Sequence, residues 1–89
     1  MNDLVHIASL LVQVLPGKRA LTEAAILEFS GAEIAHGDER GRLIVTLEAP
    51  SESQILQNLT DIQLLAGVVS ASLVYHQTDG GPDPVSAGI

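Results

Sequence analysis

The chain has 89 residues, 46% of them hydrophobic, and carries four Lys and Arg against eleven Asp and Glu, a net charge of −7. A chain of this length forms one small domain with one compact core, and its hydrophobic share excludes a wholly disordered protein. The negative charge argues against nucleic acid and anionic membranes as partners and favours a cationic one, and the absence of Cys excludes disulfides and thiolate metal sites.

The first half of the chain predicts a strand, a helix and a second strand. The side chains of Val5–Leu15 alternate between two faces, which is typical of a strand, and Pro16 and Gly17 end it. Apolar residues at helical spacing predict a helix over Lys18–Phe29. The expected buried stripe of this helix consists of Leu21, Ala25, Ile26 and Phe29. After a glycine stop, Ala32–His36 predicts a short second strand.

The second half predicts two further strands and a second helix. A polar, glycine-bounded hairpin loop over Gly37–Gly41 leads into a third strand, Arg42–Ala49. A capping box of Ser51 and Gln54 then opens a helix, because the Ser hydroxyl accepts the amide three residues on. The expected buried stripe of this second helix consists of Ile55, Leu59, Ile62 and Ala66. Gly67–Gln77, with β-branched and small residues in alternation, predicts the last strand.

The order strand, helix, strand, strand, helix, strand predicts an α+β domain with the ferredoxin-like split βαβ topology. In that topology a four-stranded antiparallel sheet has its first and third strands in the centre, and both helices cover one face. We expect this domain to span residues 5–77, after a short lead at 1–4. Residues 78–89 are rich in Gly, Pro and Asp and predict a disordered tail.

The two faces of the predicted sheet differ in hydropathy, and the more apolar one is expected to pack against the helices. That packed set consists of His6, Ala8, Leu10, Val12, Val14, Ile34, Leu43, Val45, Leu47, Val69, Ala71, Leu73 and Tyr75. The opposite set mixes apolar, hydroxyl and acidic side chains, and in a two-layer fold it stays bare unless a partner covers it. Its expected members are Ser9, Leu11, Gln13, Ile44, Thr46, Glu48, Ser70, Ser72 and Val74, with Glu33 and Ala35 near the edge.

The sequence contains no recognisable catalytic or metal-binding pattern. The histidines, His6, His36 and His76, lie on three different predicted strands without a close-spaced partner and are expected to be strand-end or rim residues. No catalytic residue, metal or cofactor is therefore expected. Phe29 and Tyr75 are the only aromatic residues and are predicted to face the helices, which also argues against nucleic-acid binding on the open side of the sheet.

Acidic side chains are expected to border the bare face where the second and third strands meet. The members of this rim are Glu33, Asp38, Glu39 and Glu48. Carboxylates pair with arginine in bidentate fashion, so a rim of this kind next to an apolar strip suits a peptide that carries arginines beside an apolar stretch.

Several stretches of the chain resemble the NapD family. The stretches are A-S-L-L-V-Q at Ala8–Gln13, F-S-G-A-E-I at Phe29–Ile34, G-R-L-I-V at Gly41–Val45, A-G-V-V-S-A-S at Ala66–Ser72 and S-L-V-Y-H-Q at Ser72–Gln77. The closing motif is the most specific of them, and the likeness runs over nearly the whole of residues 5–77. The family comprises cytoplasmic chaperones of the periplasmic nitrate reductase catalytic subunit.

The resemblance implies a ferredoxin-like chaperone, not an enzyme. It implies a protein that binds the twin-arginine signal peptide of the enzyme precursor and delays export until the cofactor is inserted and the enzyme has folded. The residues we expect to contact the peptide, inferred from the bare face, are Ser9, Leu11, Gln13, Ile44, Thr46, Ser70, Ser72 and Val74. Glu33, Glu48, Asp38 and Glu39 would then contact the arginines.

Other properties and functions follow less directly from the residues. We expect a cytoplasmic protein, because no signal peptide and no apolar run of about 18 residues is evident, and a monomer or weak dimer without membrane insertion. The alternative function is a small-molecule-sensing module that dimerises through its sheet. An enzyme of the acylphosphatase type would need an anion-binding loop after the first strand, for which Pro16–Arg19 is a slight match.

Overall fold

The computed structural model describes residues 5–79 of the chain. Its elements in order are β1 (Val5–Val14), the 3-10 turn η1 (Pro16–Lys18), α1 (Arg19–Leu27), β2 (Ala32–Gly37), β3 (Arg42–Ala49), α2 (Glu52–Gln63) and β4 (Val68–Asp79). The predicted element order is confirmed, and β4 extends two residues beyond the predicted end at Gln77. The predicted lead at 1–4, and the predicted tail from residue 80 on, lie outside the described residues.

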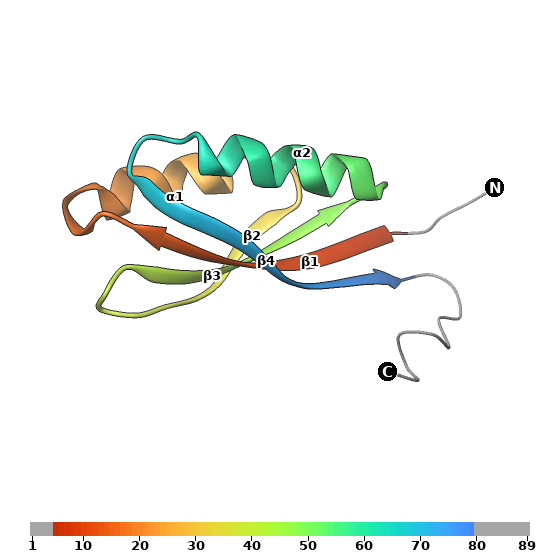
Figure 1. Ribbon diagram of the computed structural model, residues 1–89, viewed down its shortest axis with the longest axis horizontal. Coiled ribbons are helices and arrows are strands. Elements are labelled where there is room, and N and C mark those ends of the chain that lie inside the picture. The colour runs from red at the N-terminus through yellow and green to blue at the C-terminus, as the bar shows by residue number, and fades with distance from the viewer. Residues whose placement is uncertain (1–4, 80–89) are drawn as a thin grey trace.

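The four strands form one antiparallel sheet in the order β2-β3-β1-β4. The first and third strands are therefore central, as the ferredoxin-like topology predicts. Both helices lie on the same face of this sheet, so that the domain has two layers (Figure 1). Within residues 5–79, the second face of the sheet has no helix against it (Figure 1).

The core lies between the helices and the sheet and is built mainly from the two central strands. The buried apolar side chains are Ala8, Leu10, Val12, Val14, Ile26, Ala32, Leu43, Val45, Leu47, Ala49, Ile55, Ile62 and Ala71. Alternation along β1 and β3 thus gave the packed face correctly. The N-terminus of α2 is capped as predicted, because the Ser51 hydroxyl accepts the backbone amide of Gln54 at 3.1 Å. The second half of a capping box, a bond from the Gln54 side chain back to the Ser51 amide, is not formed, because that side chain donates to Asn58 at 3.0 Å.

The buried face of α1 differs from the prediction. Leu21 is 74% exposed, whereas Thr22 is only 1% exposed and lies with Ile26 on the face toward the sheet. Burial of Thr22 is possible because its hydroxyl donates to the backbone carbonyl of Ala66 at 3.1 Å, so no polar atom is left without a partner. Ala66 itself lies beyond the end of α2 and is exposed, so it does not belong to the stripe of that helix.

Two register shifts in β4 overturn part of its predicted facing. Leu10 lies opposite Leu73 but Ser9 lies opposite Tyr75, which leaves Val74 as an extra residue. The second shift, next to Val14, leaves Val69 extra and puts Val68 against the core instead. Each bulge reverses which face the following side chains occupy, because side chains alternate with a period of two. Val69 and Tyr75, both predicted to face the helices, are consequently 60% and 55% exposed.

A third shift, in β2, has the same effect on a histidine. Ile34 lies opposite Val45, yet His36 lies opposite Ile44, so that Ala35 is the extra residue. His36 therefore lies on the face of the sheet away from the helices. Tyr75 also lies on the face away from the helices, so the prediction that it faces them is wrong. The argument against nucleic-acid binding therefore depends on the negative net charge alone.

Candidate functional site

The face of the sheet away from the helices is the candidate site, and we call it the open face. Strand register assigns to it Ile7, Ser9, Leu11, Gln13, Glu33, His36, Arg42, Ile44, Thr46, Glu48, Ser70, Ser72, Tyr75 and Gln77. All the predicted peptide contacts lie on it except Val74, which is the extra residue of a bulge and is 56% exposed. Their role in binding stays a prediction.

The middle of the open face is apolar, with a polar surround. Leu11 and Ile44 lie directly opposite one another on the central strands, and Ile7 continues the same side of β1. Tyr75 adds an aromatic ring from β4, and its hydroxyl donates to the Gln77 side chain at 2.6 Å. The sequence analysis did not include Ile7 among the contacts, although it shares the parity of Leu11. Tyr75 could not be assigned to this face from alternation, because a bulge precedes it.

An acidic hollow lies at one end of the open face, where β2 begins and β3 ends. It has a volume of about 240 Å³ and is lined by Ile7, Gly31, Ala32, Glu33, Thr46, Leu47 and Glu48. Glu33 lies opposite Thr46, and Glu48 is two residues further along the same side of β3. Both carboxylates are exposed, and within residues 5–79 neither forms an ion pair. They are thus available to accept hydrogen bonds from a guanidinium or ammonium group.

The backbone under the acidic hollow is held by a glycine. Gly31 adopts a φ of 82°, in the left-handed region, and its carbonyl accepts the amide of Glu48 at 2.9 Å. A Cβ at this position would collide with the Glu48 carbonyl oxygen. Gly31 therefore fixes the approach of the β2 start to the end of β3, and with it the spacing of the two glutamates.

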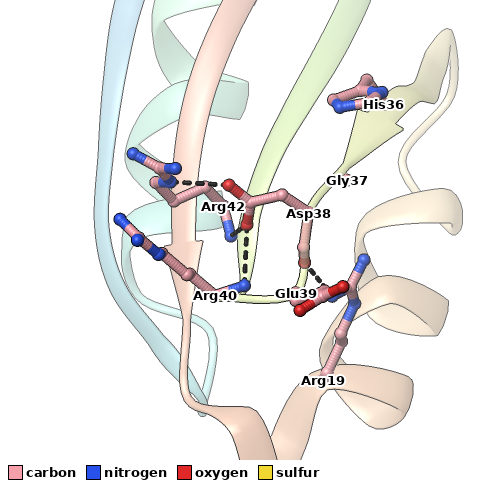
Figure 2. A pocket seen from close by; sticks show the side chains of 7 residues that line it. All are labelled: Arg19, His36, Gly37, Asp38, Glu39, Arg40 and Arg42. Atoms are coloured by element: carbon pink, nitrogen blue, oxygen red, sulfur yellow. Dashed lines mark hydrogen bonds and ion pairs between the residues drawn. The ribbon is translucent and has the colours of Figure 1, made fainter.

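The other two predicted rim acids, Asp38 and Glu39, lie at the opposite end of the sheet, in the β2–β3 hairpin (Figure 2). Arg42, next to this hairpin, and Glu48 are six residues apart on one side of β3, which corresponds to about 20 Å. The four acids do not gather into one rim as predicted, because an antiparallel hairpin turns at one end of its strands while Glu33 and Glu48 lie at the other.

The carboxylate of Asp38 is occupied by its own hairpin. It accepts the backbone amides of Arg40 and Arg42, each at 2.9 Å, and pairs with Nε of Arg42 at 2.7 Å. The amide of Arg42 holds the pKa of Asp38 below its usual value against the opposing effect of desolvation, and the Arg42 guanidinium and the Arg40 amide lower it further. Asp38 therefore closes the hairpin, and contact with a partner's arginines would compete with these bonds.

The described residues contain no candidate metal site. No three His, Asp or Glu side chains in residues 5–79 are grouped so that they could hold a metal ion. The structure does bring two histidines together that the sequence left apart, with Nδ1 of His6 and Nε2 of His76 3.1 Å from each other. Across the same residues, neither helix has the length and hydropathy needed to cross a membrane.

Fold and site together define a small two-layer α+β domain in which the helices cover one face of the antiparallel sheet and leave the open face uncovered within residues 5–79. Comparison with known proteins gives the family. A family model described as "NapD protein" matches residues 5–80. The chain is 31% identical over 75 residues to the Haemophilus influenzae chaperone NapD, covering 83% of this chain and 81% of that protein.

Further relatives agree with this match. The Escherichia coli K12 chaperone NapD is 32% identical over 75 residues, covering 83% of this chain and 86% of that protein. The solution structure of the E. coli Tat proofreading chaperone NapD superposes with a TM-score of 0.75 at 30% identity, over 89% of this chain and 84% of that one. The chain therefore belongs to the NapD family, whose matched members are chaperones.

Proposed function

We propose that this protein is a cytoplasmic chaperone without catalytic activity. It binds the twin-arginine signal peptide of the periplasmic nitrate reductase catalytic subunit precursor on the open face, and so delays export until the cofactor is inserted and the enzyme has folded. Membership of the NapD family, and the Tat proofreading role of the E. coli relative, support the class of client. The protein works as a monomer or weak dimer that sequesters the peptide.

The observation that carries the proposal is the acidic hollow at the end of an apolar sheet face. A twin-arginine signal peptide presents two guanidinium groups next to an apolar stretch. Glu33 and Glu48 offer two carboxylates without an ion pair in the described part of the chain, and Thr46 lies beside them. Charge-assisted hydrogen bonds of this kind contribute about 1.5–3 kcal/mol each, more than neutral ones.

The apolar part of the peptide has a matching surface. Leu11, Ile44 and Tyr75 extend from the acidic hollow across the middle of the sheet. Leu11 and Tyr75 are exposed in the free protein, so covering them removes apolar area from water and favours association. The net charge of −7 speeds the encounter with a basic segment.

The test is a calorimetric titration of the full chain with the twin-arginine peptide and with its Lys-Lys variant. We expect the Lys-Lys peptide to bind less tightly, because lysine does not form bidentate pairs with carboxylates. Glu33→Gln and Glu48→Gln should each weaken binding of the twin-arginine peptide by about tenfold or more, equivalent to about 1.4 kcal/mol. They should also reduce its salt dependence.

Glu28→Gln is the matched control, because it removes the same charge from an exposed residue at the end of α1, on the helical side. Its affinity should stay close to wild type. If both peptides bind with equal affinity to the wild type and to all three variants, the acidic hollow does not bind the arginines. A protein that ignores the peptides and runs as a stable dimer in size-exclusion chromatography would favour the sensing module.

A further inference from the structure

All three arginines of the chain line one hollow at the β2–β3 hairpin, the opposite end of the sheet from the acidic hollow. This arginine hollow has a volume of about 690 Å³ and is lined by Arg19, His36, Gly37, Asp38, Glu39, Arg40 and Arg42 (Figure 2). The fourth cation of the chain, Lys18, directly precedes Arg19 in sequence. Every positive side chain of a protein with a net charge of −7 is therefore gathered at one end.

Inside residues 5–79, the guanidinium groups of Arg40 and Arg42 keep more unbonded donors than that of Arg19. Arg19 is occupied by Glu23 at 2.7 Å and by the backbone carbonyl of Asp38. Arg42 uses Nε for Asp38, which leaves its terminal nitrogens without a bond inside residues 5–79. The guanidinium of Arg40 has no partner at all in that range, and it projects to the same side of the hairpin as that of Arg42 (Figure 2).

Arg42 connects this hollow to the open face. It lies opposite Gln13 on the side of β3 away from the helices, and the Gln13 side chain donates to the carbonyl of Arg40 at 2.7 Å. From there the same side of β3 continues through Ile44 and Thr46 to Glu48. The open face thus carries opposite charges at its two ends along the strands, with carboxylates at one end, guanidinium groups at the other and apolar side chains between them.

We propose that a helical segment bound on the open face takes one direction only, with its N-terminal arginines in the acidic hollow and its C-terminal end against Arg40 and Arg42. The proposal rests on the proposed function and adds a direction and a second contact to it. An α-helix carries about half a positive charge at its N-terminus and about half a negative charge at its C-terminus, in the unpaired carbonyls. Each end then meets the opposite charge of the sheet.

The dimensions of the sheet and the helix agree with this direction. The distance of about 20 Å from Glu48 to Arg42 corresponds to about 13 residues of α-helix at a rise of 1.5 Å each. In an export signal the basic residues precede an apolar stretch of about 7–15 residues, so the arginines are at the helix end that the carboxylates attract. The reverse orientation would place the arginines against Arg40 and Arg42.

The direction is measured by paramagnetic relaxation in the isotope-labelled full-length protein, titrated with a twin-arginine peptide that carries a nitroxide at one end. A label at the N-terminus should broaden amide signals around Glu33 and Glu48, and a label at the C-terminus those around Arg40 and Arg42. Exchange of the two patterns, or broadening at both ends from either label, would overturn the proposal while leaving peptide binding intact. Absence of binding by every peptide would instead overturn the proposed function, and the direction with it.

Neutralising Arg40 tests the contact between the C-terminal end of the peptide and the arginine hollow. Arg40→Gln removes a guanidinium that has no partner in the described chain, so the hairpin loses no bond, and Lys18→Gln is the matched control outside the hollow. We expect Arg40→Gln to lower the affinity for the peptide by about two- to fivefold, the range measured for exposed charge pairs, and Lys18→Gln to lower it less. A peptide with Glu about 13 residues after its arginines should gain affinity for wild type and gain less for Arg40→Gln, in which Arg42 alone remains. Equal gains for both proteins would exclude the contact.

Discussion

Ser9 lies directly opposite Tyr75 across the β1–β4 ladder, and this pairing puts the one tyrosine of the chain on the open face. The ring stands beside the apolar strip of Leu11 and Ile44 and is 55% exposed. A half-exposed tyrosine next to an apolar strip is the type of side chain that contributes most to the affinity of an interface.

Replacing Tyr75 should therefore weaken signal-peptide binding more than replacing any other residue of β4. Tyr75→Ser removes the ring, and we expect a loss of about 1–2 kcal/mol, or about five- to thirtyfold in Kd. Tyr75→Phe should bind nearly as wild type, because the hydroxyl bonds only within β4, to Gln77. Leu64→Ser, at a more exposed apolar residue after α2, controls for general loss of apolar surface. Full affinity in Tyr75→Ser would show that the peptide does not reach β4.

Much of the fold could be predicted from local patterns. Alternation along β1 and β3 identified the packed face, since both strands are central and pair in unbroken register with each other. Ser51 marked the start of α2, because a hydroxyl before a helix satisfies an amide that has no other partner. These features depend on short-range spacing, which the sequence displays directly.

The facing of the edge strands could not be predicted in the same way. The shifts at Val69, Val74 and Ala35 depend on how β4 and β2 twist against their neighbours, and nothing in the alternation of these strands marks the extra residue. For this reason Tyr75 lies on the open face instead of the predicted packed face, and His36 lies on the open face as well. The separation of the four acids into two pairs could have been predicted, because the predicted strands already place Asp38 and Glu39 at the turn of the hairpin. The same strands place Glu33 and Glu48 at its other end.

Thr22 and Leu21 offer a test of how α1 faces the sheet. Thr22→Val keeps the shape of the buried side chain but removes the hydroxyl that bonds the Ala66 carbonyl, so we expect a loss of about 1 kcal/mol in the free energy of unfolding. Leu21→Gln, at the exposed neighbour, should change it by less than about 0.5 kcal/mol. Urea unfolding followed by circular dichroism measures both. A larger loss in Leu21→Gln than in Thr22→Val would reverse the assignment.

Gly31 links the stability of the fold to the geometry of the acidic hollow. Gly31→Ala forces a side chain into a left-handed conformation and against the Glu48 carbonyl, and we expect it to destabilise the protein by more than about 2 kcal/mol. Affinity for the twin-arginine peptide should fall as well, because Glu48 must move. Gly17→Ala is the control, since a Cβ there meets nothing within 4 Å. Thermal unfolding and the peptide titration, run below the melting temperature of the variant, separate the two effects.

The hairpin carboxylate Asp38 should make a pH-dependent contribution to stability. Its pKa is lowered in the folded protein, chiefly by the Arg42 amide, so the unfolded chain binds this proton more tightly and stability falls as pH is lowered. Asp38→Asn should therefore be less stable than wild type above the ordinary pKa of 3.8, and the difference should shrink as pH falls through the lowered value. Urea midpoints at about pH 6 and about pH 2 measure it. Glu39→Gln, beside Asp38 in the hairpin, is the control and should show no such change. If the stability difference between Asp38→Asn and wild type persists at the lower pH, the charge of Asp38 does not hold the hairpin.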